Sequence, residues 1–379
     1  MPADSRDPSA LPRPSVGLEV ECAAAARAGG HTYDARAVFG RWQHYRGEHC
    51  VPGTDVHAGD LLIGSTCDTG FFSVDNGFNN LEYAFAPVGS QFGHTDASFL
   101  NRLAGTVCTE MNAVLAALHD EGAVVLNLSE HPDTAIDADV YHRLRAPKPI
   151  YTHWVADRGW RHEEGIDAKA QNGPATGVDA AGAVQALNLM LWTAPAMIAL
   201  FGNSPFEAGR ITGLLENRLT LWPRMFANAH AAGDRRFHLP PARPFRDLSD
   251  YLMWMYGPGT TMQVIPANDG TYKGYGALFC VEDAPCLLDF LSGPARRARH
   301  VGTTAVDMLC PQAGHISQQQ FAHFLDARIR FQFAKTPALP EFFDALHTRG
   351  AMEQLFSDCG ADVYIEGRAC GANFPDQEL

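Results

Sequence analysis

The stretch that most constrains the fold is residues 15–21 (SVGLEVE), where apolar and acidic residues alternate. A strand points successive side chains to opposite faces, so Val16, Leu18 and Val20 would face a core while Glu19 and Glu21 share the other face. Neighbouring carboxylates repel each other unless a cation lies between them, and oxygen ligands on a rigid strand suit Mg²⁺ or Mn²⁺. Taken alone, the pattern also fits an edge strand with a solvated acidic face.

Two further stretches repeat this pattern, residues 81–86 (LEYAFA) and 362–368 (DVYIEGR). Each places a glutamate, Glu82 or Glu366, on the face opposite apolar residues. If the three strands pair in one sheet, one side packs on helices and the other carries four carboxylates, which cannot all stay ionised at neutral pH without cations. The pattern therefore favours phosphoryl transfer from ATP, with two or more Mg²⁺ or Mn²⁺ ions bridging the phosphates.

The rest of the chain is expected to supply covering helices and loops. Apolar residues recur at helical spacing over residues 97–121, and a further helix is expected over 318–333. The apolar run 180–201 is long enough to span a membrane, but polar residues and Pro195 interrupt it and no basic flank follows it. We expect a buried helix there. Irregular segments are expected in two places, residues 146–151 and 296–299.

Composition narrows the function classes. The chain has 379 residues, with 29 Lys and Arg against 43 Asp and Glu, and the net charge of −14 argues against binding nucleic acid or an anionic membrane. The nine cysteines include no C-x-x-C pair, which favours reduced thiols in the cytoplasm over a disulfide framework or a zinc cluster. We expect a polar, Pro-rich disordered leader over residues 1–15 and a single catalytic domain over 16–379.

Four motifs carry a resemblance to a known family. Residues 17–21 (GLEVE) match a G-x-E-x-E motif, and residues 81–87 resemble a second acidic strand that ends in Ala-Pro. Residues 195–222 (PAMIALFGNSPFEAGRITGLLENRLTLW) follow the pattern P-x-x-x-A-L-F-x-N-S-P-F-x-x-G-x-x-x-G, and residues 364–368 match Y-I-E-x-R. In this order the motifs resemble the glutamate–cysteine ligase family, particularly its plant and proteobacterial branch.

The resemblance implies an α+β fold, in which an antiparallel β-sheet funnel of the glutamine synthetase and guanido kinase type is covered by helices on its apolar face. It also implies four Mg²⁺ ligands and two catalytic arginines that hold the glutamyl carboxylate or the phosphates. The spacing of the arginines near residue 210 fits separate surface positions as well as it fits a shared binding site. The predicted metal ligands are Glu19, Glu21, Glu82 and Glu366, the catalytic residues are Arg218 and Arg368, and further substrate or nucleotide contacts are expected from Asn203, Arg210 and Lys273.

The implied reaction belongs to glutathione biosynthesis. The γ-carboxylate of glutamate attacks ATP to give an acyl phosphate, and the amine of cysteine then displaces phosphate. Two departures keep alternatives open. Residues 174–179 lack the Gln/Asn-bearing strand of the family, and the chain stops at Leu379, where relatives continue into helices that are here either lost or replaced by an interface, such as that of a homodimer. The alternatives are an amide ligase for other amino acids in specialised metabolism and a non-catalytic binding subunit.

Overall fold

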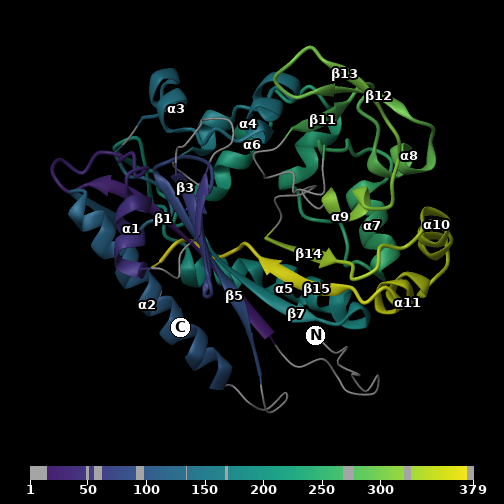
Figure 1. The fold of residues 1–379 in the computed structure, drawn as a ribbon, viewed down its shortest axis with the longest axis horizontal. Helices are drawn as coiled ribbons and strands as arrows, with labels where there is room; N and C mark the ends of the chain where they lie inside the picture. The colour runs from purple at the N-terminus through teal and green to yellow at the C-terminus, as the bar shows by residue number, and fades with distance from the viewer. Residues whose placement is uncertain are drawn as a thin grey trace.

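The computed structural model describes residues 15–47, 51–54, 62–90, 98–133, 135–166, 170–267, 277–319 and 326–373. The predicted leader, apart from Ser15, and Lys273 lie outside these residues. The described chain is an α+β fold built on a large antiparallel sheet (Figure 1), which confirms the predicted fold class. The single domain expected over residues 16–379 stays a prediction.

The main sheet has nine strands, in the order β14-β15-β7-β1-β5-β4-β3-β2, with β6 paired to β1. All three acidic stretches of the sequence are strands of this sheet. Its strands are β1 (Ser15–Ala26), β2 (Val51–Thr54), β3 (Leu62–Cys67), β4 (Gly70–Val74), β5 (Asn80–Gly89), β6 (Ala123–Leu126), β7 (Asn172–Val178), β14 (Ala327–Gln332) and β15 (Asp362–Gly367).

The register of the sheet decides which acidic residues meet. Glu21 on β1 lies directly opposite Glu82 on β5. Strand β7 separates β1 from β15, so Glu366 lies opposite Ala175 of β7 and has no direct partner on β1. The four glutamates therefore share one sheet, but only two of them face each other across adjacent strands.

Helices cover the apolar side of the sheet and form two hydrophobic cores. One core joins the inward side chains of β1 and β5, including Val20 and Tyr83, to α1 (Val38–Arg46) and α2 (Ser98–Asp120). The other joins β14 and β15 to a group of helices behind them. That group contains α5 (Ala180–Phe201), α7 (Leu248–Tyr256), α8 (Leu287–Ser292), α10 (Leu339–His347) and α11 (Ala351–Asp358).

Shorter elements fill the remainder of the chain. A second, four-stranded sheet has the order β10-β11-β12-β13, and β8 and β9 form a small hairpin. Their bounds are β8 (Phe206–Glu207), β9 (Arg210–Ile211), β10 (Ile265–Pro266), β11 (Leu278–Val281), β12 (Arg296–His300) and β13 (Val306–Leu309), and the short helices are α3 (Ala138–Leu144), α4 (Pro149–Thr152), η2 (His153–Asp157), η3 (His162–Gly165), η4 (Asn217–Thr220), α6 (Leu221–Met225), η5 (Ala232–His238) and α9 (His315–Gln318).

Three local expectations were wrong. Within the helix expected over 318–333, residues 327–332 form the strand β14 instead, and their sequence A-R-I-R-F-Q alternates polar and apolar residues with the period of a strand. The segment 296–299, expected as a solvated loop, is part of β12, and residues 149–152 form α4. In each case pairing or packing with distant residues decided the conformation of a short segment.

Helix α5 has the predicted bounds but is not buried all round. Ala183 and Leu187 on its inner side pack into the core, whereas Trp192 on its outer side is 85% exposed. Within the described part of the chain, α5 is the one helix long and apolar enough to cross a membrane by length and composition. The expected burial is therefore correct for the inner side only.

Candidate active site

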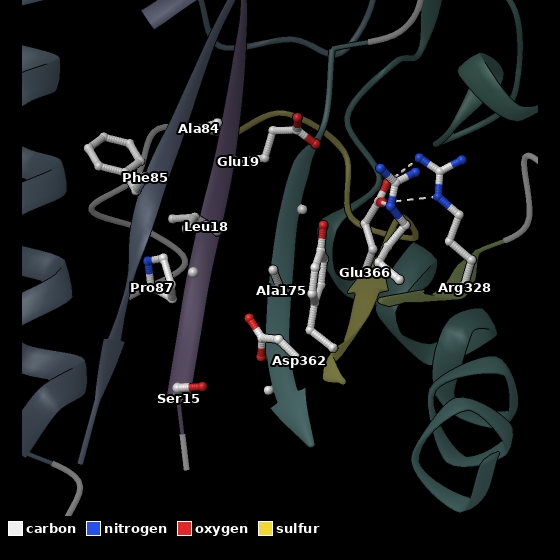
Figure 2. A pocket seen from close by; sticks show the side chains of 15 residues that line it. Ser15, Leu18, Glu19, Ala84, Phe85, Pro87, Ala175, Arg328, Asp362 and Glu366 are labelled. Carbon is white, nitrogen blue, oxygen red and sulfur yellow. Dashed lines mark hydrogen bonds and ion pairs between the residues drawn. The ribbon is translucent and has the colours of Figure 1, made fainter. Parts of the chain in front are cut away.

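A cavity of about 310 Å³ lies over the polar face of the sheet, where β1, β7, β14 and β15 run side by side (Figure 2). Gly173, Ala175 and Gly177 of β7 form its floor, and none of them has a side chain larger than a methyl group. Charged groups border this floor on both sides. They are Glu19 on β1, Arg328 and Arg330 on β14, and Asp362 and Glu366 on β15.

An acidic cluster, formed by Glu21, Asp75 and Glu82, lies further along β1. One carboxylate oxygen of each residue lies within 4.8 Å of the others. Burial, followed by the charges of Asp75, Glu19 and Glu82, raises the pKa of Glu21 well above its ordinary value, while Arg368 opposes this shift. Negative neighbours therefore outweigh the positive one at Glu21, and a divalent cation with a preference for oxygen ligands suits this donor set.

Asp75 reaches the acidic cluster from the turn that follows β4. Its main-chain carbonyl accepts hydrogen bonds from Lys148 Nζ, at 3.0 Å, and from the Tyr151 hydroxyl. The neighbouring Ser73 lies opposite Glu82 in the register of β4 and β5, which brings this turn to the glutamates. The sequence pattern did not single out Asp75, since a turn residue carries no periodic signal.

An arginine cluster surrounds Glu366 on the other side of β7. Arg328 donates to both carboxylate oxygens, at 3.0 and 2.7 Å, and Arg368 Nη1 donates to Oε1 at 2.6 Å. Arg330 Nε lies 3.7 Å from Oε2. Burial alone would raise the pKa of Glu366, but Arg328, Arg368 and Arg330 together lower it well below its ordinary value. The predicted role of Glu366 as a metal ligand stays a prediction, and its observed partners are guanidinium groups.

Arg328 and Arg330 were missed because residues 318–333 were predicted as a helix. On β14 they are two residues apart and point to the same face of the sheet. Figure 2 shows Arg328 beside Glu366, with Glu19 across β7 from both. The alternation of arginine with Ala327, Ile329 and Phe331 is the signal that could have placed them.

Arg218 is buried away from the cavity. Its Nε donates to Glu216 Oε1 at 2.6 Å, and its Nη2 donates to the carbonyls of Arg368 and Cys370, at 3.3 and 3.5 Å. Its side chain is 2% exposed. Arg218 therefore holds the segment that follows β15 and, through it, the backbone of Arg368.

Asn203 also connects segments of the chain. Its Nδ2 donates to the carbonyls of Asn127 and Ala372, at 2.7 and 3.1 Å, and to Asn373 Oδ1 at 3.0 Å. Asn203 and Arg218 are not among the residues that line the cavity, and Arg210 is exposed on β9. Their predicted contacts with substrate or nucleotide stay predictions, as does that of Lys273.

The segment that departs from the family pattern is β7 itself. The two polar residues before its glycine-rich part, Gln171 and Asn172, are buried. The Glu21 amide donates to the Gln171 carbonyl at 3.0 Å, and Asn172 Nδ2 donates to the Asn373 carbonyl at 2.9 Å. Both residues thus lie at the acidic end of the site, and the cavity end of β7 carries small residues.

Comparison with known proteins finds a family model that is similar to the central part of the chain. The profile of glutamate-cysteine ligase family 2 (GCS2) matches residues 64–251, which include Glu82 and β7. No curated protein matches the sequence. Among solved structures, the glutamate–cysteine ligase of Francisella tularensis in complex with AMP is similar at 13% identity, with a TM-score of 0.32, over 52% of this chain and 36% of that one. Over residues 64–251, just under half of its length, the chain is similar to glutamate-cysteine ligase family 2.

Proposed function

We propose that the protein is an ATP- and Mg²⁺-dependent carboxylate–amine ligase, most simply one that joins the γ-carboxylate of glutamate to the amine of cysteine. One observation carries the proposal: a single sheet face holds an acidic cluster suited to cations, an arginine cluster suited to anions and a cavity of about 310 Å³ beside them. An enzyme that transfers a phosphoryl group between two anionic substrates needs these two kinds of site together.

The acidic cluster fits the metal that the family implies. Glu21, Asp75 and Glu82 offer only oxygen ligands, and we propose that they hold Mg²⁺ or Mn²⁺, with Glu19 at the border of the cavity as a further ligand. The pKa of Glu21, raised by burial and by the neighbouring carboxylates, supports this assignment because a bound cation would stabilise the charged form. When bound, the metal would neutralise charge on the transferring phosphoryl group.

The arginine cluster is proposed to orient the anionic groups of the substrates. Guanidinium groups bind carboxylate and phosphate oxygens in pairs, which fixes the direction of approach. The side chain of Arg330 is 21% exposed and that of Arg328 only 2%, so Arg330 is the better placed to contact a ligand in the cavity. Glu366 holds Arg328 and Arg368 in fixed positions.

The proposed reaction has two steps. An oxygen of the γ-carboxylate attacks the γ-phosphorus of ATP, the bond to ADP breaks, and an acyl phosphate forms. The neutral amine then attacks the acyl carbon, phosphate leaves with the bonding electron pair, and the amine nitrogen releases a proton. Holding both substrates in the same cavity makes each attack effectively intramolecular.

A related function is favoured by one feature, the absence of polar side chains on the floor formed by β7. Gly173, Ala175 and Gly177 offer no side-chain hydrogen bond to glutamate or cysteine, where the family pattern has a strand with Gln and Asn. The second candidate is therefore an amide ligase for another pair of amino acids. Glutathione biosynthesis, a cytoplasmic location and a homodimer stay proposals.

The test is turnover with defined substrates. The protein is incubated with ATP, Mg²⁺ and pairs from a panel of amino acids, while phosphate release and product mass are followed. Glutamate- and cysteine-dependent turnover supports the first function, and turnover with only another pair supports the second. We expect Glu82→Gln to lower turnover on the order of 100-fold or more, while the surface variant Glu282→Gln leaves it unchanged. A folded protein that neither binds Mg²⁺-ATP nor turns over any pair would contradict both functions.

A further inference from the structure

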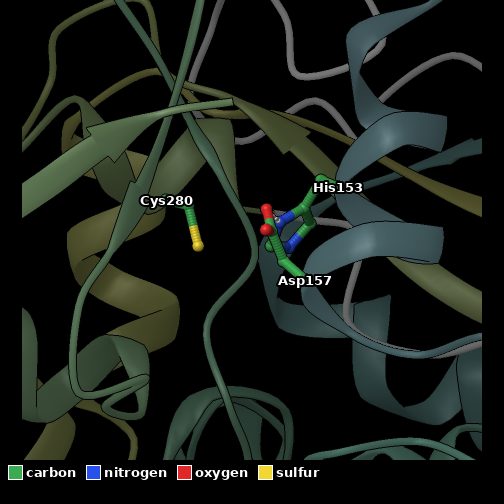
Figure 3. A group of neighbouring side chains, drawn as sticks. All are labelled: His153, Asp157 and Cys280. Atoms are coloured by element: carbon green, nitrogen blue, oxygen red, sulfur yellow. Dashed lines mark hydrogen bonds and ion pairs between the residues drawn. The ribbon is translucent and has the colours of Figure 1, made fainter. Parts of the chain in front are cut away.

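Three side chains with metal-ligand chemistry meet far from the cavity, between η2 and the second sheet. His153 and Asp157 are the first and last residues of the π-helical turn η2, and Cys280 lies on β11. One nitrogen, oxygen or sulfur atom of each lies within 4.8 Å of the others (Figure 3). None of the three residues lines the cavity of the proposed active site.

His153 is prepared for a ligand on one ring nitrogen. Its Nδ1 is hydrogen-bonded to Asp157 Oδ2 at 2.8 Å, so this nitrogen, and not Nε2 on the opposite side of the ring, can share a cation with Asp157. The residue is only 1% exposed. π-helical turns often occur at functional sites, so a buried imidazole beside a carboxylate in such a turn calls for a physical explanation.

Asp157 and Cys280 are held relative to each other by Arg299. The guanidinium of Arg299 forms an ion pair with Asp157 Oδ1, and Arg299 is the cross-strand partner of Cys280 in the pairing of β11 with β12. The other guanidinium near His153, that of Arg158, is paired with the carboxylate of Asp234. Such outer partners fix the orientation of the first ligands in metal sites.

We propose that His153, Asp157 and Cys280 form a second metal site, distinct from the acidic cluster, that binds a thiophilic divalent cation such as Zn²⁺. An imidazole, a carboxylate and a thiolate are ligands of Zn²⁺, whereas Mg²⁺ prefers oxygen atoms alone. Binding breaks the S–H bond of Cys280, forms a sulfur–metal bond and releases the proton to solvent. Three protein ligands leave one position of a tetrahedral ion for water or another ligand.

Cobalt spectroscopy of the full chain tests the site. The protein is stripped with a chelator and titrated with Co²⁺ in the presence of excess Mg²⁺. We expect one equivalent of Co²⁺ to produce a thiolate-to-cobalt charge-transfer band in the near ultraviolet, which Zn²⁺ then abolishes. The acidic cluster contains no sulfur and cannot produce this band. The absence of the band would therefore contradict the second metal site without testing the proposed ligase function.

Matched variants identify the ligands. Cys280→Ser is expected to lose the band, whereas Cys286→Ser, which changes a thiol outside the proposed site, retains it. Asp157→Asn is expected to weaken Co²⁺ binding about 10- to 100-fold, with circular dichroism used to verify the fold of each variant. A folded wild-type protein without the band, an unchanged band in Cys280→Ser or unchanged affinity in Asp157→Asn would each overturn the proposal.

Discussion

Glu21 and Glu366 are both buried on the polar face of one sheet, 4% and 9% exposed, yet their surroundings are opposite. Burial and the neighbouring carboxylates raise the pKa of Glu21, whereas guanidinium groups lower the pKa of Glu366 in spite of its burial. The strand β7 lies between them. Since burial raises the pKa of both glutamates, the opposite directions of the two pKa shifts come from their neighbouring charges.

This difference also indicates separate roles for the two ends of the proposed site. Glu366 already has positive partners, while the surroundings of Glu21 favour an added cation. Arg368 lies between the two, because it donates to Glu366 at 2.6 Å and its charge is felt by Glu19 and Glu21. One end of the polar face is thus suited to cations, and the other end is suited to anions.

The largest effect is expected from Glu366→Gln. Removing this charge leaves several buried guanidinium groups without their counter-ion, and breaking a buried ion pair in this way typically costs about 3–5 kcal/mol. Urea unfolding at pH 7 measures the change. The control is Glu282→Gln, which removes an exposed pair with Arg297 at 2.8 Å and should cost about 1 kcal/mol or less. Equal losses of stability in Glu366→Gln and Glu282→Gln would contradict the role of Glu366 as the counter-ion of the buried arginines.

Mg²⁺ should stabilise the wild-type protein through the acidic cluster. At 100 times its dissociation constant, a ligand that binds only the folded state adds about 2.7 kcal/mol of stability. Thermal unfolding with increasing Mg²⁺ measures this gain, and Glu82→Gln should remove most of it. A gain that is unchanged in Glu82→Gln but lost in Glu366→Gln would place the metal at the other end of the sheet.

Glu21→Gln is expected to stabilise the metal-free protein. The pKa of Glu21 is raised in the folded state, so the protonated form of Glu21 favours folding. This stabilisation is fully present below the unfolded-state pKa of about 4.3 and is lost as pH rises through the folded-state pKa. The variant should therefore gain on the order of 1–3 kcal/mol at pH 8, with the gain vanishing as pH approaches 4. The free energies of unfolding of the wild type and of Glu21→Gln are measured across this pH range without Mg²⁺. A difference between them that does not change with pH would contradict the raised pKa of Glu21 as its cause.

The smallest effects are expected at the arginines. Arg330→Lys should raise the KM of an anionic substrate roughly tenfold, because one charged hydrogen bond is worth about 1.5–3 kcal/mol and a tenfold change about 1.4 kcal/mol. Arg210→Lys, on the exposed β9, should change it less than about twofold. Steady-state kinetics of both variants compare the two positions, and a larger effect at Arg210 would move the anion site away from β14.

Much of this arrangement was predictable from local pattern. The alternation in β1, β5 and β15 correctly assigned each glutamate to the polar face, and the bounds of α5 matched the predicted 180–201. The site was predicted less completely. Arg328 and Arg330 were assigned to a helix, and Asp75 had no periodic signal, because short strands and turns depend on partners that lie far away in the sequence.

The sequence by itself determined which side chains share a face of each strand, since the period of two is a local property of the backbone. Only the tertiary structure decided which charges meet. It inserted β7 between β1 and β15, placed Asp75 beside Glu21 and surrounded Glu366 with arginines from β14. The physical reason is that electrostatic interaction depends on distance in space and on burial, and residues 328 and 366 become neighbours only when their strands pair.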